Sequence, residues 1–151
     1  MYRLLIQTEK TPMEMQWSEE EFMRALLVDD SLLLRMMVER AIRASDVLID
    51  EFVHATNGKD ALQVLRSELR NGKSFDLIVT DTNMPQMTGL EFLERMQHEK
   101  LCSTAQIIMI TTENSEEHLA RAQAAGSKGN ISKPFTPEQV NTVICPLMQG
   151  R

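Results

Sequence analysis

Hydrophobic residues follow two alternating patterns along positions 24–149. Short apolar runs rich in β-branched side chains are followed by longer segments in which apolar residues return every three or four positions. The short runs predict buried β-strands, and the longer segments predict amphipathic helices, with five of each. We expect the strands at 24–28, 48–55, 76–80, 106–111 and 127–131.

Each predicted helix has an apolar stripe that we expect to face a core. In chain order, the five stripes are Leu34, Met37, Val38, Ala41 and Ile42; Ala61, Val64, Leu65 and Leu69; Leu90, Leu93 and Met96; Leu119 and Ala122; and Val140, Val143, Ile144, Leu147 and Met148. Strands and helices that alternate in this way predict an α/β fold with a parallel sheet. Because most strand segments are continuously apolar, we expect helices on both faces, as in a doubly wound sheet.

The 151 residues suit one domain, which we expect at 24–149. Residues 1–23 fall outside the alternation and form an N-terminal extension. Ser18 and Glu21 have the spacing of a capping box, which predicts a short helical turn before the first strand. A loosely packed extension is favoured over an arm that docks or dimerises.

Charge and hydropathy exclude two classes of partner. The formal net charge is −6, and no cluster of Lys and Arg overrides it, so binding to nucleic acid is not expected. The apolar runs are too short to cross a bilayer, and the N-terminus lacks the apolar stretch of a secretory signal. We therefore expect a cytoplasmic protein with no membrane contact.

Polar residues stand where the predicted strands end. Asp29 and Asp30 follow the first strand, Asp81 follows the third, Thr111 ends the fourth, and Lys133 follows the fifth. In an open parallel sheet, the binding site lies beyond the carboxyl ends of the strands, where the strand order reverses. The pattern therefore predicts three carboxylates, a hydroxyl and a lysine at one edge.

Three neighbouring carboxylates repel one another and require a counter-charge. Oxygen ligands with few protein carboxylates suit Mg²⁺, and the sequence offers no His or Cys pattern for zinc or copper. A carboxylate beside Mg²⁺ can attack a phosphoryl group and form an acyl phosphate. A lysine and a hydroxyl nearby would then stabilise the phosphoryl oxygens.

Each residue taken alone has a simpler interpretation. Asp30 or Ser31 could cap the first helix, and Asp81 could belong to a turn. Thr111 could be an ordinary strand residue, and Lys133 could be solvated. Their joint position at the ends of successive strands favours the functional interpretation.

Several segments together resemble the response-regulator receiver family. They are LLVDDS at 26–31, ATNG at 55–58, DLIVTDTNMP at 76–85 with Gly89, Ile110-Thr111, Ala125-Gly126 and Lys133-Pro134-Phe135. The resemblance covers about residues 24–149 and implies a strand order of 2-1-3-4-5. It further implies a single-domain response regulator of a two-component system that is not an enzyme and that signals through contacts with a downstream protein.

The resemblance also implies roles for individual residues. Asp81 would accept a phosphoryl group from a sensor histidine kinase or a histidine phosphotransfer protein. Asp30, Asp81 and the backbone carbonyl of Asn83 would bind Mg²⁺, with Asp29 acting through water. Lys133 would pair with the phosphoryl group and precede a cis proline bond.

Thr111 would swing toward the phosphoryl group, but the sequence departs from the family pattern nearby. Asn130 stands where receivers usually carry Tyr or Phe, so the signal cannot be the inward turn of a ring. Thr112 stands where a smaller residue is common. Asn83 and Glu113 match a pair that influences self-dephosphorylation in chemotaxis-type receivers, which suggests a short-lived phosphorylated state.

Two other functions remain as alternatives. A Mg²⁺-dependent aspartyl-phosphate hydrolase would require a second acid two positions after its nucleophile, where this sequence has Asn83. A degenerate receiver would act as an unphosphorylated binding module. Asn130 favours that second alternative, whereas the acids, Thr111 and Lys133 oppose it.

Overall fold

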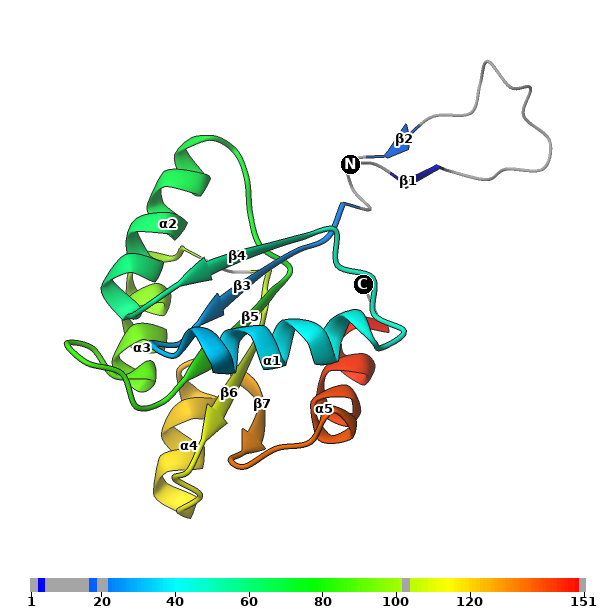
Figure 1. Cartoon of the computed structure of the whole chain (residues 1–151). Helices are drawn as coiled ribbons and strands as arrows, with labels where there is room; N and C mark the ends of the chain where they lie inside the picture. Colours follow the sequence, from blue (N-terminus) through cyan, green and yellow to red (C-terminus); the bar gives the residue numbers. More distant parts are fainter. Residues whose placement is uncertain (1–2, 5–16, 19–21, 102–103, 150–151) are drawn as a thin grey trace.

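The computed structural model describes residues 3–4, 17–18, 22–101 and 104–149. Within these ranges, five parallel strands form one sheet in the order β4-β3-β5-β6-β7, which is the order 2-1-3-4-5 (Figure 1). The doubly wound α/β fold and its strand order are therefore as predicted. The elements of this fold are β3 (Arg24–Val28), α1 (Leu32–Arg43), β4 (Glu51–Ala55), α2 (Gly58–Arg70), β5 (Leu77–Asp81), α3 (Gly89–Glu99), β6 (Gln106–Thr111), α4 (Glu116–Ala124), β7 (Ser127–Ser132) and α5 (Pro137–Gln149).

The sheet separates two hydrophobic cores. Helices α1 and α5 cover one face, and α2, α3 and α4 cover the other (Figure 1). Every residue of β3 and β5 is buried, which explains why their sequences are almost continuously apolar. The order reverses between these two strands, because β3 lies between β4 and β5.

Side-chain caps begin the helices directly after the loops at the carboxyl edge of the sheet. Ser31 accepts a hydrogen bond from the backbone N–H of Leu34 and caps α1. Asn57 caps α2 in the same way, and Thr88 forms a capping box with Glu91 at the start of α3. These caps satisfy backbone donors that the first helical turn leaves unpaired, and so they hold the loops in place.

Three sequence predictions need correction, one about the start of a strand and two about buried helix residues. The second strand begins at Glu51 and not at position 48, and Leu48 is 66% exposed. Met37 and Leu69, predicted to face a core, are 43% and 50% exposed. A helical period fixes the direction of a buried face only to within about one position, and Arg35 occupies a place on the inner face of α1 that an apolar pattern does not reveal.

The described part of the N-terminal extension contains two short strands. β1 (Arg3–Leu4) and β2 (Trp17–Ser18) pair in an antiparallel manner. Ser18, expected to cap a helical turn, lies in β2, while its expected partner Glu21 lies outside the described residues. Within the described ranges, no helix has the length and hydropathy that crossing a bilayer requires.

Candidate functional site

Three carboxylates meet at the carboxyl edge of the sheet, where the strand order reverses. Asp29 and Asp30 follow β3, and Asp81 is the last residue of the neighbouring strand β5. One oxygen from each carboxylate lies within 4.8 Å of the other two. Asp29 and Asp81 are buried, whereas Asp30 is exposed, so the group is open to solvent on one side. The structure thus brings together the three acids that the sequence places at these strand ends.

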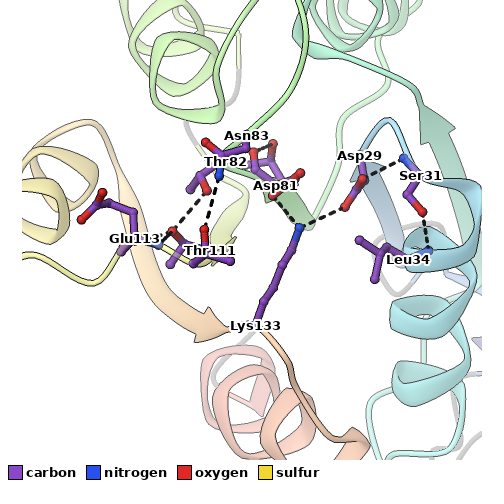
Figure 2. Close-up of polar contacts among 11 residues, drawn as sticks. Asp29, Ser31, Leu34, Asp81, Thr82, Asn83, Thr111, Glu113 and Lys133 are labelled. Atoms are coloured by element: carbon purple, nitrogen blue, oxygen red, sulfur yellow. Dashed lines mark hydrogen bonds and ion pairs between the residues drawn. The ribbon is translucent and has the colours of Figure 1, made fainter.

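Lys133 reaches the same group from the loop after β7. Its Nζ donates a hydrogen bond to Asp81 Oδ1 at 2.8 Å and lies 3.9 Å from Asp29 Oδ2 (Figure 2). The Lys133 N–H donates to the carbonyl of Thr111 at 2.9 Å, which fixes the loop against β6. The Lys133–Pro134 bond is cis, as the resemblance implied.

The charges at this edge do not balance. Burial raises the pKa of Asp29 to about 6, and the charge of Asp81 acts in the same direction. A hydrogen bond from the Ser31 N–H at 2.8 Å and the charge of Lys133 oppose this increase in the pKa of Asp29. The raised pKa means that holding all three carboxylates ionised costs free energy unless a further cation is present.

The donor set fits a magnesium ion. The group consists of carboxylate oxygens, and among the described residues it includes no His or Cys ligand. Mg²⁺ prefers oxygen ligands and keeps several waters, which requires an open side such as the one beside Asp30. Asn83 follows Asp81 by two positions and is exposed, with its side-chain amide donating to Thr112 Oγ1 at 3.4 Å.

Thr111 belongs to the edge but does not face Asp81 in this conformation. Its hydroxyl accepts hydrogen bonds from the Glu113 N–H at 2.7 Å and from the Thr82 hydroxyl at 3.1 Å. It donates to the Glu113 carbonyl at 3.1 Å. The sequence did not identify Thr82 as part of this network, although a polar residue directly after Asp81 is a possible signal.

Arg35 is a second residue that the sequence did not identify. It is 7% exposed, and its guanidinium donates to the backbone carbonyl of Asp29 and to Nδ1 of His54, the latter at 3.0 Å. Arg35 therefore holds the backbone that carries the first carboxylate. The signal in the sequence is its spacing of three and seven positions from Val38 and Ile42, which places an arginine on the buried face of α1.

An apolar surface lies beside the carboxylates on α1. We define the α1 apolar surface as Leu32, Leu33, Met36 and Met37, which are 59%, 67%, 47% and 43% exposed. Next to it, a groove of about 330 Å³ is lined by Leu34, Met37, Thr112, Lys133, Pro134 and Phe135. An apolar patch that reaches a charged site in this way is typical of a surface for binding a protein.

Asn130 lies on β7, where the resemblance led us to expect an aromatic ring. Its side chain is half-buried, and Oδ1 has no hydrogen-bond partner among the described residues. A conformational signal from this site must therefore use side chains other than a ring at Asn130.

Comparison with known proteins assigns the class. A family model described as the response regulator receiver domain matches residues 25–144, and the chain belongs to this family. It is therefore a signalling receiver at family level, and membership favours that function over a hydrolase. The chain is similar to a CheY homolog of Campylobacter jejuni, with 33% identity over 116 residues that cover 77% of this chain and 85% of the relative.

Two further relatives point to the same group. The chemotaxis protein CheY of Pseudomonas aeruginosa is 32% identical over 122 residues, covering 81% of this chain and 93% of that protein. The solved structure of CheY4 from Vibrio cholerae has a TM-score of 0.70 and 32% identity, covering 83% of this chain and 98% of that one. The chain is thus a CheY-like receiver of the response-regulator family.

Proposed function

We propose that this receiver accepts a phosphoryl group on Asp81 from the phosphohistidine of a sensor histidine kinase or a histidine phosphotransfer protein. The observation that carries the proposal is the Asp81 carboxylate, held at the end of β5 by Lys133 at 2.8 Å beside two more carboxylates. We assign the receiver domain to residues 24–149 and regard 1–23 as an N-terminal extension.

The transfer uses groups that the chain already places. A carboxylate oxygen of Asp81 forms a bond to phosphorus as the bond from phosphorus to the donor imidazole breaks, and the electron pair of the broken bond stays on that nitrogen. Lys133 then pairs with the phosphoryl oxygens, and Thr111 donates a hydrogen bond to one of them after it leaves Glu113.

A magnesium ion would be held by Asp30, Asp81 and the backbone carbonyl of Asn83, with Asp29 acting through water. The ion would supply positive charge opposite the phosphoryl oxygens when it is bound. The excess of carboxylates and the raised pKa of Asp29 support this assignment.

The α1 apolar surface is the place where the donor protein docks. A histidine can reach Asp81 only if its protein covers the open side of the site, and this surface borders that side through the groove at Met37 and Lys133. An apolar helix face that carries the phosphohistidine fits both the chemistry and the position. Phosphorylation would then alter the face formed by α4, β7 and α5, and so change the affinity for a downstream protein.

A direct test uses a small phosphodonor and measures label that is retained by the chain. While the phosphodonor is present, we expect labelling of up to one phosphoryl group per chain with Mg²⁺ and almost none with a chelator. If no label enters under either condition, the binding-module alternative replaces this proposal. Continuous release of phosphate from small phosphoesters, at a rate that saturates with the phosphoester concentration, would instead favour the hydrolase.

A further inference from the structure

Thr82 is held rigidly next to the proposed acceptor. It is 3% exposed, and its N–H donates to the carbonyl of Ile110 at 3.2 Å. Its own carbonyl accepts a hydrogen bond from the N–H of Gly89 at 2.9 Å. Any side chain added at Gly89 would collide with the carbonyl of Asp81, so α3 begins in close contact with this loop. The Thr82 hydroxyl is therefore a donor in a fixed position.

The hydroxyl of Thr111 has no hydrogen-bonding capacity left. A threonine hydroxyl offers one donor and two acceptor lone pairs. Thr111 gives its proton to the Glu113 carbonyl and accepts from the Glu113 N–H and from Thr82, as Figure 2 shows. It cannot donate to a phosphoryl oxygen until it gives up its bond to the Glu113 carbonyl, and a turn of the whole side chain toward Asp81 would also break the bond that it accepts from Thr82.

We propose that Thr82 is a positioning residue whose hydroxyl holds Thr111 in the unphosphorylated orientation and so lowers the population of the active conformer. This inference rests on the proposed function, because it assumes that Thr111 moves to the phosphoryl group on Asp81. Thr82 does not contact that group itself; it acts through Thr111.

Two costs make the restraint effective. When Thr111 leaves, its hydrogen bond from Thr82 is lost, and the Thr82 hydroxyl remains in a buried place without this partner. Replacing the hydroxyl by a methyl group removes both costs of the movement. The measured affinity for a phosphoryl group or its mimic depends on the fraction of molecules that already have the active conformation, so removing the hydroxyl should raise that affinity.

The test is a titration of the full chain with beryllofluoride, a phosphoryl mimic, in the presence of Mg²⁺, followed by amide chemical shifts. Thr82→Val has nearly the shape of threonine, and we expect it to bind about three- to tenfold more tightly than the wild type, the range for one buried neutral hydrogen bond. Thr82→Ala and Thr82→Ser form a second pair that differs by one hydroxyl. We expect the alanine variant to bind more tightly than the serine variant by a similar factor.

The direction of the change separates this role from a purely structural one. Damage to the loop would weaken binding, whereas loss of the restraint strengthens it. Repeating the comparison in a Thr111→Val background should abolish the gain, because the restraint acts through Thr111. The inference is overturned if Thr82→Val binds no more tightly than the wild type and Thr82→Ala no more tightly than Thr82→Ser. It is also overturned if the gain persists without the Thr111 hydroxyl.

Failure of the proposed function has a different signature. If the wild type does not bind beryllofluoride with Mg²⁺, the acceptor assignment fails, and the role of Thr82 fails with it. If the wild type binds normally and the two hydroxyl pairs show no difference, the assignment of Asp81 stands and only the role of Thr82 is rejected. If Thr82→Val does not fold, the alanine and serine pair still decides.

Discussion

The two ends of the central sheet differ in how their buried charges are paired. At the amino end of β3, Arg24 is 6% exposed, yet its guanidinium pairs with Glu51 at 2.8 Å and Glu68 at 2.9 Å and lies 4.5 Å from the centre of the Phe75 ring. At the carboxyl end, among the described residues, three carboxylates lie together, and Lys133 pairs with two of them, Asp29 and Asp81. The ion pairs of Arg24 link its strand to a neighbouring strand and to a helix. At the carboxyl end, the excess of negative charge leaves a site that still requires a cation.

The difference teaches that carboxylates stabilise the amino end, where they pair with Arg24, and destabilise the carboxyl end, where they crowd together. Removing a charge at the amino end should leave partners unpaired and weaken the fold. Removing one carboxylate charge at the carboxyl end should relieve repulsion and strengthen the fold while impairing function. The predictions below test this contrast.

The largest effect is expected for Arg24→Met. The change removes a buried guanidinium that pairs with Glu68 and Glu51, whose side chains are 24% and 46% exposed. Because solvent reaches the two glutamates, we expect a loss of about 2–3 kcal/mol in the free energy of unfolding, measured with urea, at or below the lower end of the range for a fully buried pair. Arg43→Met is the matched control, since Arg43 also pairs with a glutamate and lies 4.7 Å from the centre of the Phe52 ring but is 56% exposed. We expect the control to lose less than about 1 kcal/mol. Similar losses for both would remove the contrast at the amino end.

Asp29→Asn should have the opposite sign. A pKa raised from 3.8 to about 6 means that the folded protein holds the proton more tightly than the unfolded chain. The resulting stability is fully present below the unfolded value and is lost as the pH rises through about 6. Without divalent cations at pH 8, the variant should therefore be more stable by about 1–2 kcal/mol, allowing for screening and using about 1.4 kcal/mol per pKa unit.

The gain from Asp29→Asn should shrink as the pH falls from 8 through about 6 and should be nearly absent near pH 4, because protonation of Asp29 relieves the repulsion in the wild type. Adding Mg²⁺ at pH 8 should also reduce the gain. Urea unfolding at the two pH values, with a chelator or with Mg²⁺, measures this. A variant that is less stable than the wild type at pH 8 with a chelator would show that charge at this edge is already balanced.

Leu33→Asp tests the α1 apolar surface. A charge in the middle of this surface should slow transfer from a phosphohistidine protein by about tenfold or more, as for loss of a central interface side chain. Transfer from a small phosphodonor should not change, because Leu33 is an exposed residue of α1 and does not belong to the carboxylate group. Leu69→Asp on α2 is the control, with a side chain that is 50% exposed. If both variants transfer as fast as the wild type, the donor docks elsewhere.

The smallest effect concerns the lifetime of the phosphorylated state. Asn83 and Glu113 are exposed beside Asp81 and Thr111, where they can orient water toward the acyl phosphate. Replacing both by Leu should lengthen the lifetime about two- to fivefold, less than the effect of removing a group that acts directly in proton transfer. Decay of the label after removal of the phosphodonor measures this, and an unchanged decay rate would exclude a role for the pair.

The sequence predicts the carboxyl edge well, because parallel strands bring their last residues together. Asp29, Asp81 and Lys133 each stand at a strand end, so their meeting follows from the strand pattern alone. The amino end is harder to predict. Arg24 pairs with Glu51 across 27 positions of the chain, and nothing local distinguishes this glutamate from a solvated one.

Side-chain orientation also lies beyond the pattern. A threonine after a strand has several rotamers, so the bond between Thr82 and Thr111 appears only when the loops are packed together. The inner face of α1 gives a second example, because an apolar stripe predicted Met37 there and the structure uses Arg35. Thr82 and Arg35 each contact a residue of the site, and they are placed by tertiary contacts that the local pattern does not encode.

The most direct test of the central claim is the intact mass of the chain, followed by peptide mapping, after incubation with Mg²⁺ and a small phosphodonor. We predict one phosphoryl adduct that maps to Asp81, is lost on treatment with hydroxylamine as an acyl phosphate should be, and is absent from Asp81→Asn. An adduct of equal yield in Asp81→Asn, or no adduct in the wild type although the protein is folded, would contradict the account.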